Sequence, residues 1–285
     1  MNIIDTSDAL LAAFDADGFD MERWVRYIDG AKPGVKELCV ADMEACLRAG
    51  CSWEGDYLPV LNGVVRKPEK RAEAVRTFHA VTGQLDDRIR ARFGRTVDAD
   101  VILYLGLCSG AGWVTSVGGK TTVLLGIEKI IELDWCSADA MTGLIVHELG
   151  HVYQAQYGVL HRETQSNAER FLWQLFTEGI AMVFEQETVG APERYHQDRG
   201  GWKRWCDRNA ELIRRSFYED LPEMTFETQR YFGDWVRFEG QPDTGYYLGA
   251  RFVRFLLERE DFDRILSYDL AEVKDAFERF LRAPL

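Results

Sequence analysis

A short segment with two histidines one helical turn apart constrains this 285-residue chain more than any other feature. The sequence HELGH at residues 147–151 lies in a proline-free run, 138–157, which Ser137 precedes as a suitable N-cap and Gly158 follows as a suitable stop. Apolar residues recur in this run at the spacing of one buried helical side, so we expect a helix. Positions i and i+4 lie on one helical face, and the two imidazoles can therefore bind the same metal ion. Glu148 follows the first histidine and is placed to take a proton from a water molecule at that ion.

A third ligand is expected on a second helix, over Ser166–Val189. A catalytic zinc site uses three protein ligands and keeps one position open. Glu178 is a charged residue in the most apolar part of this segment, where a charge is costly unless it is paired or bound to a metal. Gly179 and Ala181 beside it are small, as close packing of two helices requires, and Gly150 would let another segment approach the first helix. Glu178 is therefore the favoured third ligand.

Other ligand arrangements are less consistent with the sequence. The longer pattern HExxHxxGxxH needs glycine at 154 and histidine at 157, where the chain has Gln154 and Tyr157, so it is excluded. His161 and Glu163 come just after the predicted end of the first helix and could reach back only through an unusual loop. Solvated positions are expected for the remaining glutamates of the second helix and for two other histidines: Glu169, Glu185, Glu187, His79 and His196.

The order of these motifs resembles a known family. HExxH followed by Glu-Gly-x-Ala at 178–181 is similar to the gluzincin branch of zinc metallopeptidases, the thermolysin and aminopeptidase N type. The resemblance implies that His147, His151 and Glu178 bind one zinc ion per chain and that Glu148 is the general base. The 27-residue gap from His151 to Glu178 is longer than is usual in the aminopeptidases, so we expect an enlarged loop over 158–166. In detail the chain looks closest to a bacterial family of predicted zinc-dependent proteases whose substrates are largely undefined.

A third motif follows in the order that this family has. Residues 245–253 contain Tyr-x-x-Gly, with Tyr246 as the tyrosine and Gly249 as the glycine. In aminopeptidase-like gluzincins a tyrosine hydroxyl at this place faces the reacting carbonyl, so the resemblance implies a catalytic role for Tyr246, with Tyr247 as the alternative. The resemblance covers about residues 98–260.

A hairpin is predicted just upstream of the histidines. After a buried strand over Val101–Leu107, the segments Trp113–Val117 and Thr121–Ile127 flank Gly118-Gly119-Lys120, which is a hairpin signal. In gluzincins an edge strand lies over the site and pairs with the extended substrate backbone, which supplies hydrogen bonds without demanding a sequence. We expect 121–126 to be this edge strand. An ordinary structural hairpin explains any single residue in it equally well. The substrate-binding residues expected there are Thr121, Thr122 and Val123.

The fold class expected is α+β, a zincin-like metallopeptidase fold that is mostly helical with a small mixed sheet. No linker, repeat or low-complexity segment interrupts the chain. We therefore expect an N-terminal helical portion, 1–95, packed on a metallopeptidase domain, 96–285. Further helices are predicted over 6–15, 21–28, 35–50, 68–93, 192–217, 246–260 and 269–281.

Composition excludes several classes of partner. With 34 basic and 47 acidic residues the net charge is −13, which argues against binding to nucleic acid or to an anionic membrane. The first residues lack the features of a secretory signal, and no apolar run approaches membrane-spanning length, so we expect a cytoplasmic protein. The six cysteines show no metal-ligand spacing and are expected to be free and partly buried, although Cys39, Cys46 and Cys51 are close enough to raise a metal or redox role.

The sequence thus predicts a zinc-dependent peptidase that acts on peptide or protein substrates. The exopeptidase signature Gly-x-Met-Glu-Asn of the aminopeptidase N type is missing upstream of HExxH, which favours an endopeptidase. The alternative is a zincin-like scaffold that binds metal or a partner without turnover. Glu148 and Tyr246 favour the enzyme, because a structural metal site needs no base and closes all four positions with protein ligands. Oligomeric state is not defined by the sequence.

Overall fold

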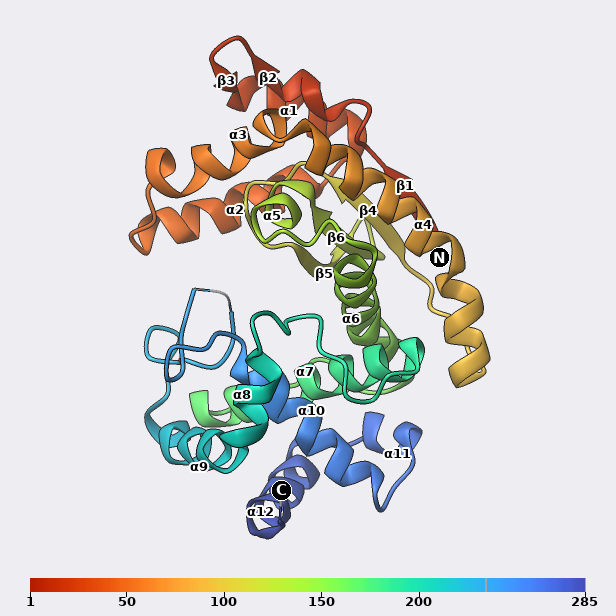
Figure 1. Cartoon of the computed structure of the whole chain (residues 1–285), viewed down its shortest axis with the longest axis vertical. Coiled ribbons are helices and arrows are strands. Elements are labelled where there is room, and N and C mark those ends of the chain that lie inside the picture. Colours follow the sequence, from red (N-terminus) through yellow and green to blue (C-terminus); the bar gives the residue numbers. More distant parts are fainter. Residues whose placement is uncertain (234, 285) are drawn as a thin grey trace. The chain divides into compact units, whose positions relative to one another are not determined.

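A four-stranded mixed sheet organises the first half of the chain in the computed structural model, which describes residues 1–233 and 235–284. Its strand order is β1-β4-β6-β5 (Figure 1). Strands β1 (Asn2–Asp5), β4 (Asp100–Tyr104) and β6 (Lys120–Gly126) run parallel, and β5 (Gly112–Val117) pairs antiparallel with β6. Every residue of β4 is buried, as its continuous apolar sequence predicted. The predicted class, mostly helical α+β with a small mixed sheet, is confirmed.

The β5–β6 hairpin is confirmed, but its place in the sheet differs from the prediction. Val117 pairs with Lys120, so the turn consists of Gly118 and Gly119, whose φ angles are +59° and +79°. Two positive φ angles are those of a type I′ turn, which matches the twist of the strands. Strand β5 forms the edge, whereas β6 lies between β4 and β5. The expectation that 121–126 is the edge strand is therefore wrong.

Helices surround this sheet in the first of two compact units, Met1–Glu148 (Figure 1). The predicted helix over 6–15 is replaced by a 3₁₀ turn and a short hairpin, in which Phe14 pairs with Phe19. The elements are η1 (Leu10–Ala13), β2 (Phe14–Asp15), β3 (Gly18–Phe19), α1 (Met21–Ala31), α2 (Val35–Arg48), η2 (Trp53–Tyr57), α3 (Leu58–Arg66), α4 (Pro68–Phe93) and α5 (Ile127–Glu132).

The second unit, Leu149–Leu285, consists of helices in its described part. Helix α6 (Ala138–Tyr157) passes without interruption from the first unit into the second. Strand β1 pairs with β4, so the N-terminal segment and the residues that directly follow 96 share one unit. The predicted division into an N-terminal portion, 1–95, and a domain, 96–285, stays a prediction. The other helices are α7 (Asn167–Val189), α8 (Trp202–Arg208), α9 (Ala210–Asp220), η3 (Leu221–Glu223), α10 (Thr244–Leu257), α11 (Phe262–Leu266) and α12 (Leu270–Arg282).

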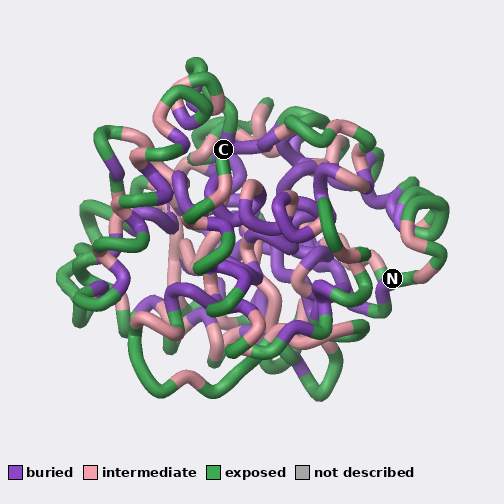
Figure 2. Tube along the Cα trace, turned by 90° about the horizontal axis from the view of Figure 1, so that it is seen from below, coloured by how far each residue is buried: buried purple, intermediate pink, exposed green. Residues whose placement is uncertain are grey.

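Two features of the second unit follow from local sequence. The predicted helix over 192–217 begins only at α8, because Gly200 and Gly201 adopt positive φ, and it breaks between α8 and α9. Helix α12 buries one face, at Val273, Phe277 and two further positions, and a capping box fixes its first turn. Figure 2 shows buried and exposed stretches alternating along the helices in this way. Among the described residues, every helix is too short or too polar to span a bilayer.

Candidate metal centre

Helix α6 presents His147 and His151 one turn apart, within the predicted bounds. The Ser137 hydroxyl accepts a hydrogen bond from a backbone N–H of the first turn at 3.3 Å, as an N-cap does. At the other end, a Cβ on Gly158 would lie 2.2 Å from the carbonyl oxygen of Leu266, so only glycine is tolerated there. The predicted start and stop of the helix are both confirmed.

Helix α7 packs backbone to backbone against the second half of α6. A Cβ added at Gly150 would lie 2.8 Å from the Cα of Ala181, so the glycine allows a very close approach. One residue further along α6, His151 Nε2 lies 3.3 Å from Glu178 Oε2.

The three predicted ligands come together. One ligand atom each of His147, His151 and Glu178 lies within 4.8 Å of the others. At zinc–ligand bonds of about 2.0–2.1 Å, tetrahedral coordination separates neighbouring ligand atoms by roughly 3.3 Å, which agrees with the 3.3 Å between His151 and Glu178. His147 is buried and the other two are mostly buried. Two imidazoles and one carboxylate are the donor set of a catalytic zinc site with an open fourth position, so the residues present fit that ion.

Glu148 lies against the edge strand of the sheet. A Cβ at Gly112 of β5 would be 2.8 Å from Glu148 Cγ and 2.9 Å from its Oε1. The glutamate side chain therefore occupies the space that a side chain at 112 would need, and it is buried. A glycine at 112 thus sets where the Glu148 carboxylate can lie relative to the backbone of β5.

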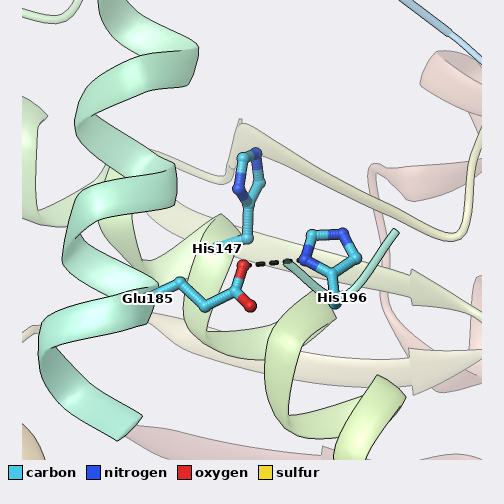
Figure 3. A group of neighbouring side chains, drawn as sticks. All are labelled: His147, Glu185 and His196. Carbon is cyan, nitrogen blue, oxygen red and sulfur yellow. Dashed lines mark hydrogen bonds and ion pairs between the residues drawn. The ribbon is translucent and has the colours of Figure 1, made fainter. Parts of the chain in front are cut away.

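A second group of possible ligands includes the same histidine. Figure 3 shows His147 with Glu185 and His196, whose ligand atoms also lie within 4.8 Å of one another. Glu185 Oε2 pairs with His196 Nδ1 at 2.7 Å, and its other oxygen, Oε1, pairs with Arg194. We expected Glu185 and His196 to be solvated; both are buried, and these predictions are wrong. Glu185 follows Glu178 by two helical turns, which was the available signal, whereas His196 lies in a loop without periodic pattern.

The bonds of Glu185 favour the first group as the metal site. Arg194 compensates its charge and both of its oxygens already have partners within the protein, so binding an ion would cost these contacts. Glu178 instead has an imidazole at the distance that shared coordination requires. A carboxylate oxygen of Glu185 also lies within 4.8 Å of a ring nitrogen of His147.

The alternative ligands that the sequence left open lie elsewhere. His161 and Glu163 are exposed residues of the segment between α6 and α7. Glu169 accepts hydrogen bonds from Lys274 at 2.6 Å and from the backbone of Gln165, and the bond from Lys274 lowers the pKa of its carboxyl group. Each therefore has an environment unlike that of the two ligand groups.

Helix α10 crosses α7 beside Glu178. A Cβ at Gly179 would lie 2.2 Å from the carbonyl oxygen of Gly249, so the two backbones touch. Gly249 is the glycine of the Tyr-x-x-Gly motif, and Tyr246 precedes it by one helical turn. The crossing therefore joins the second and third sequence motifs in space.

The two tyrosines of this motif differ in their surroundings. Tyr247 is buried and its hydroxyl donates to Asp207 at 3.1 Å; burial raises the pKa of this hydroxyl above its usual value. Tyr246 is only half-buried, and its ring packs edge-on against Phe232 at 5.9 Å. The hydroxyl of Tyr247 is thus engaged in the fold, and the catalytic role expected for Tyr246 stays a prediction.

The three residues expected to bind substrate all lie on β6. Thr122 and Val123 are fully buried and Thr121 is half-buried. Because β6 is hydrogen-bonded to strands on both sides, the free edge expected for these residues belongs to β5. Their contact with a substrate stays a prediction.

A buried glutamate fixes the loop that leads into β5. Glu128 Oε2 accepts a hydrogen bond from the Gly106 backbone N–H at 2.9 Å, and Oε1 accepts one from Cys108 at 3.2 Å. Burial raises the pKa of Glu128 from the ordinary 4.5 to about 7, although these two hydrogen bonds oppose the shift. This residue holds the segment after β4 in place without being part of the metal centre.

Comparison with known proteins adds no identification: no family model, no curated protein and no solved structure matches the chain.

Proposed function

We propose that the chain is a zinc-dependent peptidase of gluzincin type that cleaves peptide or protein substrates internally. The observation that carries this proposal is the convergence of His147, His151 and Glu178, whose ligand atoms lie within 4.8 Å of one another. The donor set is that of a catalytic zinc site, and a glutamate follows the first histidine in the position of a general base.

The chain's own groups have distinct tasks in this reaction. When bound, the zinc ion would polarise the scissile carbonyl and lower the pKa of a water molecule. Glu148 takes the proton of the attacking water and passes it to the leaving amine. The Tyr246 hydroxyl donates a hydrogen bond to the developing oxyanion, a contribution of about 3 kcal/mol for one such donor. Glu178 brings one negative charge that partly balances the ion.

Strand β5 is the proposed platform for the substrate backbone. It forms an edge of the sheet, and its residue Gly112 contacts the Glu148 side chain. An extended peptide added to this edge would be held by main-chain hydrogen bonds, so its scissile bond could lie near Glu148 without a strict sequence requirement. This arrangement suits an endopeptidase, because it does not require a chain terminus.

Metal content of tag-free protein, purified without added metal or chelator, tests the first part of the proposal. We expect about one zinc ion per chain, and we expect Glu178→Gln to lower zinc affinity by roughly tenfold or more because a charged ligand is lost. Glu169→Gln is the matched control, since it removes the same charge from the same helix at a residue that pairs with Lys274. Equal zinc affinity in both variants would exclude Glu178 as a ligand.

Hydrolysis of denatured protein and of peptide libraries tests the second part. Glu148→Gln should retain zinc and lose roughly 10²–10⁴-fold in kcat, the usual contribution of general acid–base catalysis. Full activity in this variant would refute the mechanism. A parent protein that binds zinc and cleaves none of these substrates would instead favour the scaffold without turnover.

A further inference from the structure

The C-terminal end of helix α2 brings two cysteines together. Its last residues form a Schellman motif: the N–H of Gly50 bonds to the carbonyl of Leu47 at 3.2 Å, and the N–H of Cys51 bonds to that of Cys46 at 3.1 Å. Gly50 supplies the positive φ, +109°, that this turn requires. In a Schellman motif the side chains at the two positions joined by the longer bond usually contact each other. Here both side chains are cysteines.

The thiols of this pair interact and are accessible to different degrees. Burial raises the pKa of the Cys46 thiol, and the nearby Tyr57 hydroxyl and Cys51 thiol have smaller effects on it. Cys46 is half-buried and Cys51 is exposed. An exposed thiol can meet a soluble oxidant, and a half-buried thiol in contact with it can resolve the product.

The remaining cysteines are placed differently. Cys39 is fully buried, with its sulfur 3.7 Å from the Tyr104 hydroxyl. Cys136 and Cys206 are also fully buried, and Cys108 is half-buried, with a pKa that burial raises. Buried thiols of this kind react slowly with oxidants in water.

We propose that Cys46 and Cys51 are a reversible oxidation site at which a peroxide or a low-molecular-weight disulfide forms an intramolecular disulfide bond. With hydrogen peroxide, the Cys51 sulfur attacks one oxygen, the O–O bond breaks, and one water leaves as Cys51 becomes a sulfenic acid. The Cys46 sulfur then attacks the Cys51 sulfur, the S–O bond breaks, and a second water leaves as the S–S bond forms. Two electrons pass from the two thiols to the peroxide. With a low-molecular-weight disulfide, the Cys51 sulfur attacks its S–S bond and releases one thiol, and the Cys46 sulfur then attacks the mixed disulfide and releases the second thiol as the Cys46–Cys51 bond forms. A dithiol reductant returns the two electrons by thiol–disulfide exchange.

The Cys46–Cys51 disulfide would restrict the motion of the segment that follows α2. Ser52 caps the next helical turn by accepting a hydrogen bond from the Gly55 N–H at 3.0 Å, and the same segment ends at Tyr57, which lies near Cys46. Oxidation should therefore slow hydrogen exchange across 49–57 relative to the reduced protein.

Peptide mapping tests the proposal directly, because Arg48 lies between the two cysteines. The full-length protein is reduced, freed of reductant, oxidised with stoichiometric hydrogen peroxide or excess glutathione disulfide, and digested with trypsin without reduction. We expect two of the six thiols to be lost and the peptides 37–48 and 49–66 to appear as one linked species. Dithiothreitol should restore both thiols and release the two peptides as separate species.

Single variants identify the sulfurs. The linked species should persist in Cys39→Ser, whose cysteine shares peptide 37–48, and should vanish in Cys46→Ser and Cys51→Ser. Linkage through Cys39, linkage between two chains, or overoxidation of Cys51 with Cys46 unchanged would overturn the proposal.

The turn itself can be tested with a glycine pair. Gly50→Ala strains a positive φ although no atom lies near the added methyl group, whereas Gly30→Ala adds a methyl group to helix α1, also in open space. We expect disulfide formation to slow severalfold in the first variant and to stay unchanged in the second. Equal rates in both would show that the Schellman geometry does not create the site.

Discussion

Replacing Gly179 by alanine should push α7 and α10 apart at the crossing beside Glu178. The new Cβ would lie 2.2 Å from the carbonyl oxygen and 2.5 Å from the carbonyl carbon of Gly249, whereas ordinary contacts of a Cβ begin at 3.4 Å. Both opposing atoms belong to the backbone, so no rotamer change relieves the clash, and the helices must separate by about 1 Å. Overpacking of this kind costs about 1–3 kcal/mol, against a gain of up to ~1 kcal/mol from the higher helix propensity of alanine.

A matched control separates these two effects. Gly83 lies in α4 with no atom within 4 Å of the added methyl group, so Gly83→Ala should show the gain in helix propensity alone. Urea unfolding followed by circular dichroism gives the free energy of unfolding of each variant against the parent. We expect Gly179→Ala to be less stable than Gly83→Ala by about 1–3 kcal/mol or more. If both variants gain stability equally, the backbone contact between α7 and α10 does not exist in solution.

Two other substitutions test the surroundings of the site. Gly112→Ala should displace the Glu148 side chain and lower kcat roughly tenfold or more with zinc still bound, because small misplacements of a catalytic group are costly. Unchanged kcat together with unchanged zinc content would show that β5 does not hold Glu148 in place. The raised pKa of Glu128 means that the folded protein binds a proton at this carboxyl more tightly than the unfolded chain does. This preference adds to the free energy of unfolding in full below pH 4.5, and the contribution is lost as the pH rises to about 7. The loss amounts to about 3 kcal/mol at 1.4 kcal/mol per pKa unit. Glu128→Gln should lack this component of the stability–pH profile measured by urea unfolding, and parallel profiles for parent and variant would contradict the buried, protonated state.

The parts of the site that the sequence predicted are those that depend on helical periodicity. His147 and His151 share a face because they are four residues apart on one helix, and Glu178 was conspicuous as a charge within an apolar run. Glu185 obeys the same periodicity, but its partners Arg194 and His196 come from a loop. The position of a loop residue depends on tertiary contacts, so the ion pairs of Glu185 with these two residues could not be deduced from the helix alone.

The order of strands in the sheet could not be predicted from the hairpin pattern alone. A hairpin pattern specifies that β5 and β6 pair, but not which of them also pairs with β4. The composition held a clue, since β6 ends in the continuous apolar run 123–125 and β5 mixes apolar and polar residues. Strands buried on both faces have the former pattern, so the interior place of β6 agrees with its sequence.

Small residues explain how the second unit can hold reactive side chains in fixed positions. Gly150 of α6 meets Ala181 of α7, and Gly179 of α7 meets Gly249 of α10, so three helices contact one another through backbone atoms. Each crossing lies within one turn of a proposed site residue: His151 follows Gly150, Glu178 precedes Gly179, and Tyr246 precedes Gly249. Backbone contacts have no rotamers to absorb a shift, so they define the spacing of the helices more strictly than contacts between long side chains do. Two ligand atoms that share an ion must stay near 3.3 Å apart, and the backbone contacts at these glycines fix the helix spacing on which that distance depends.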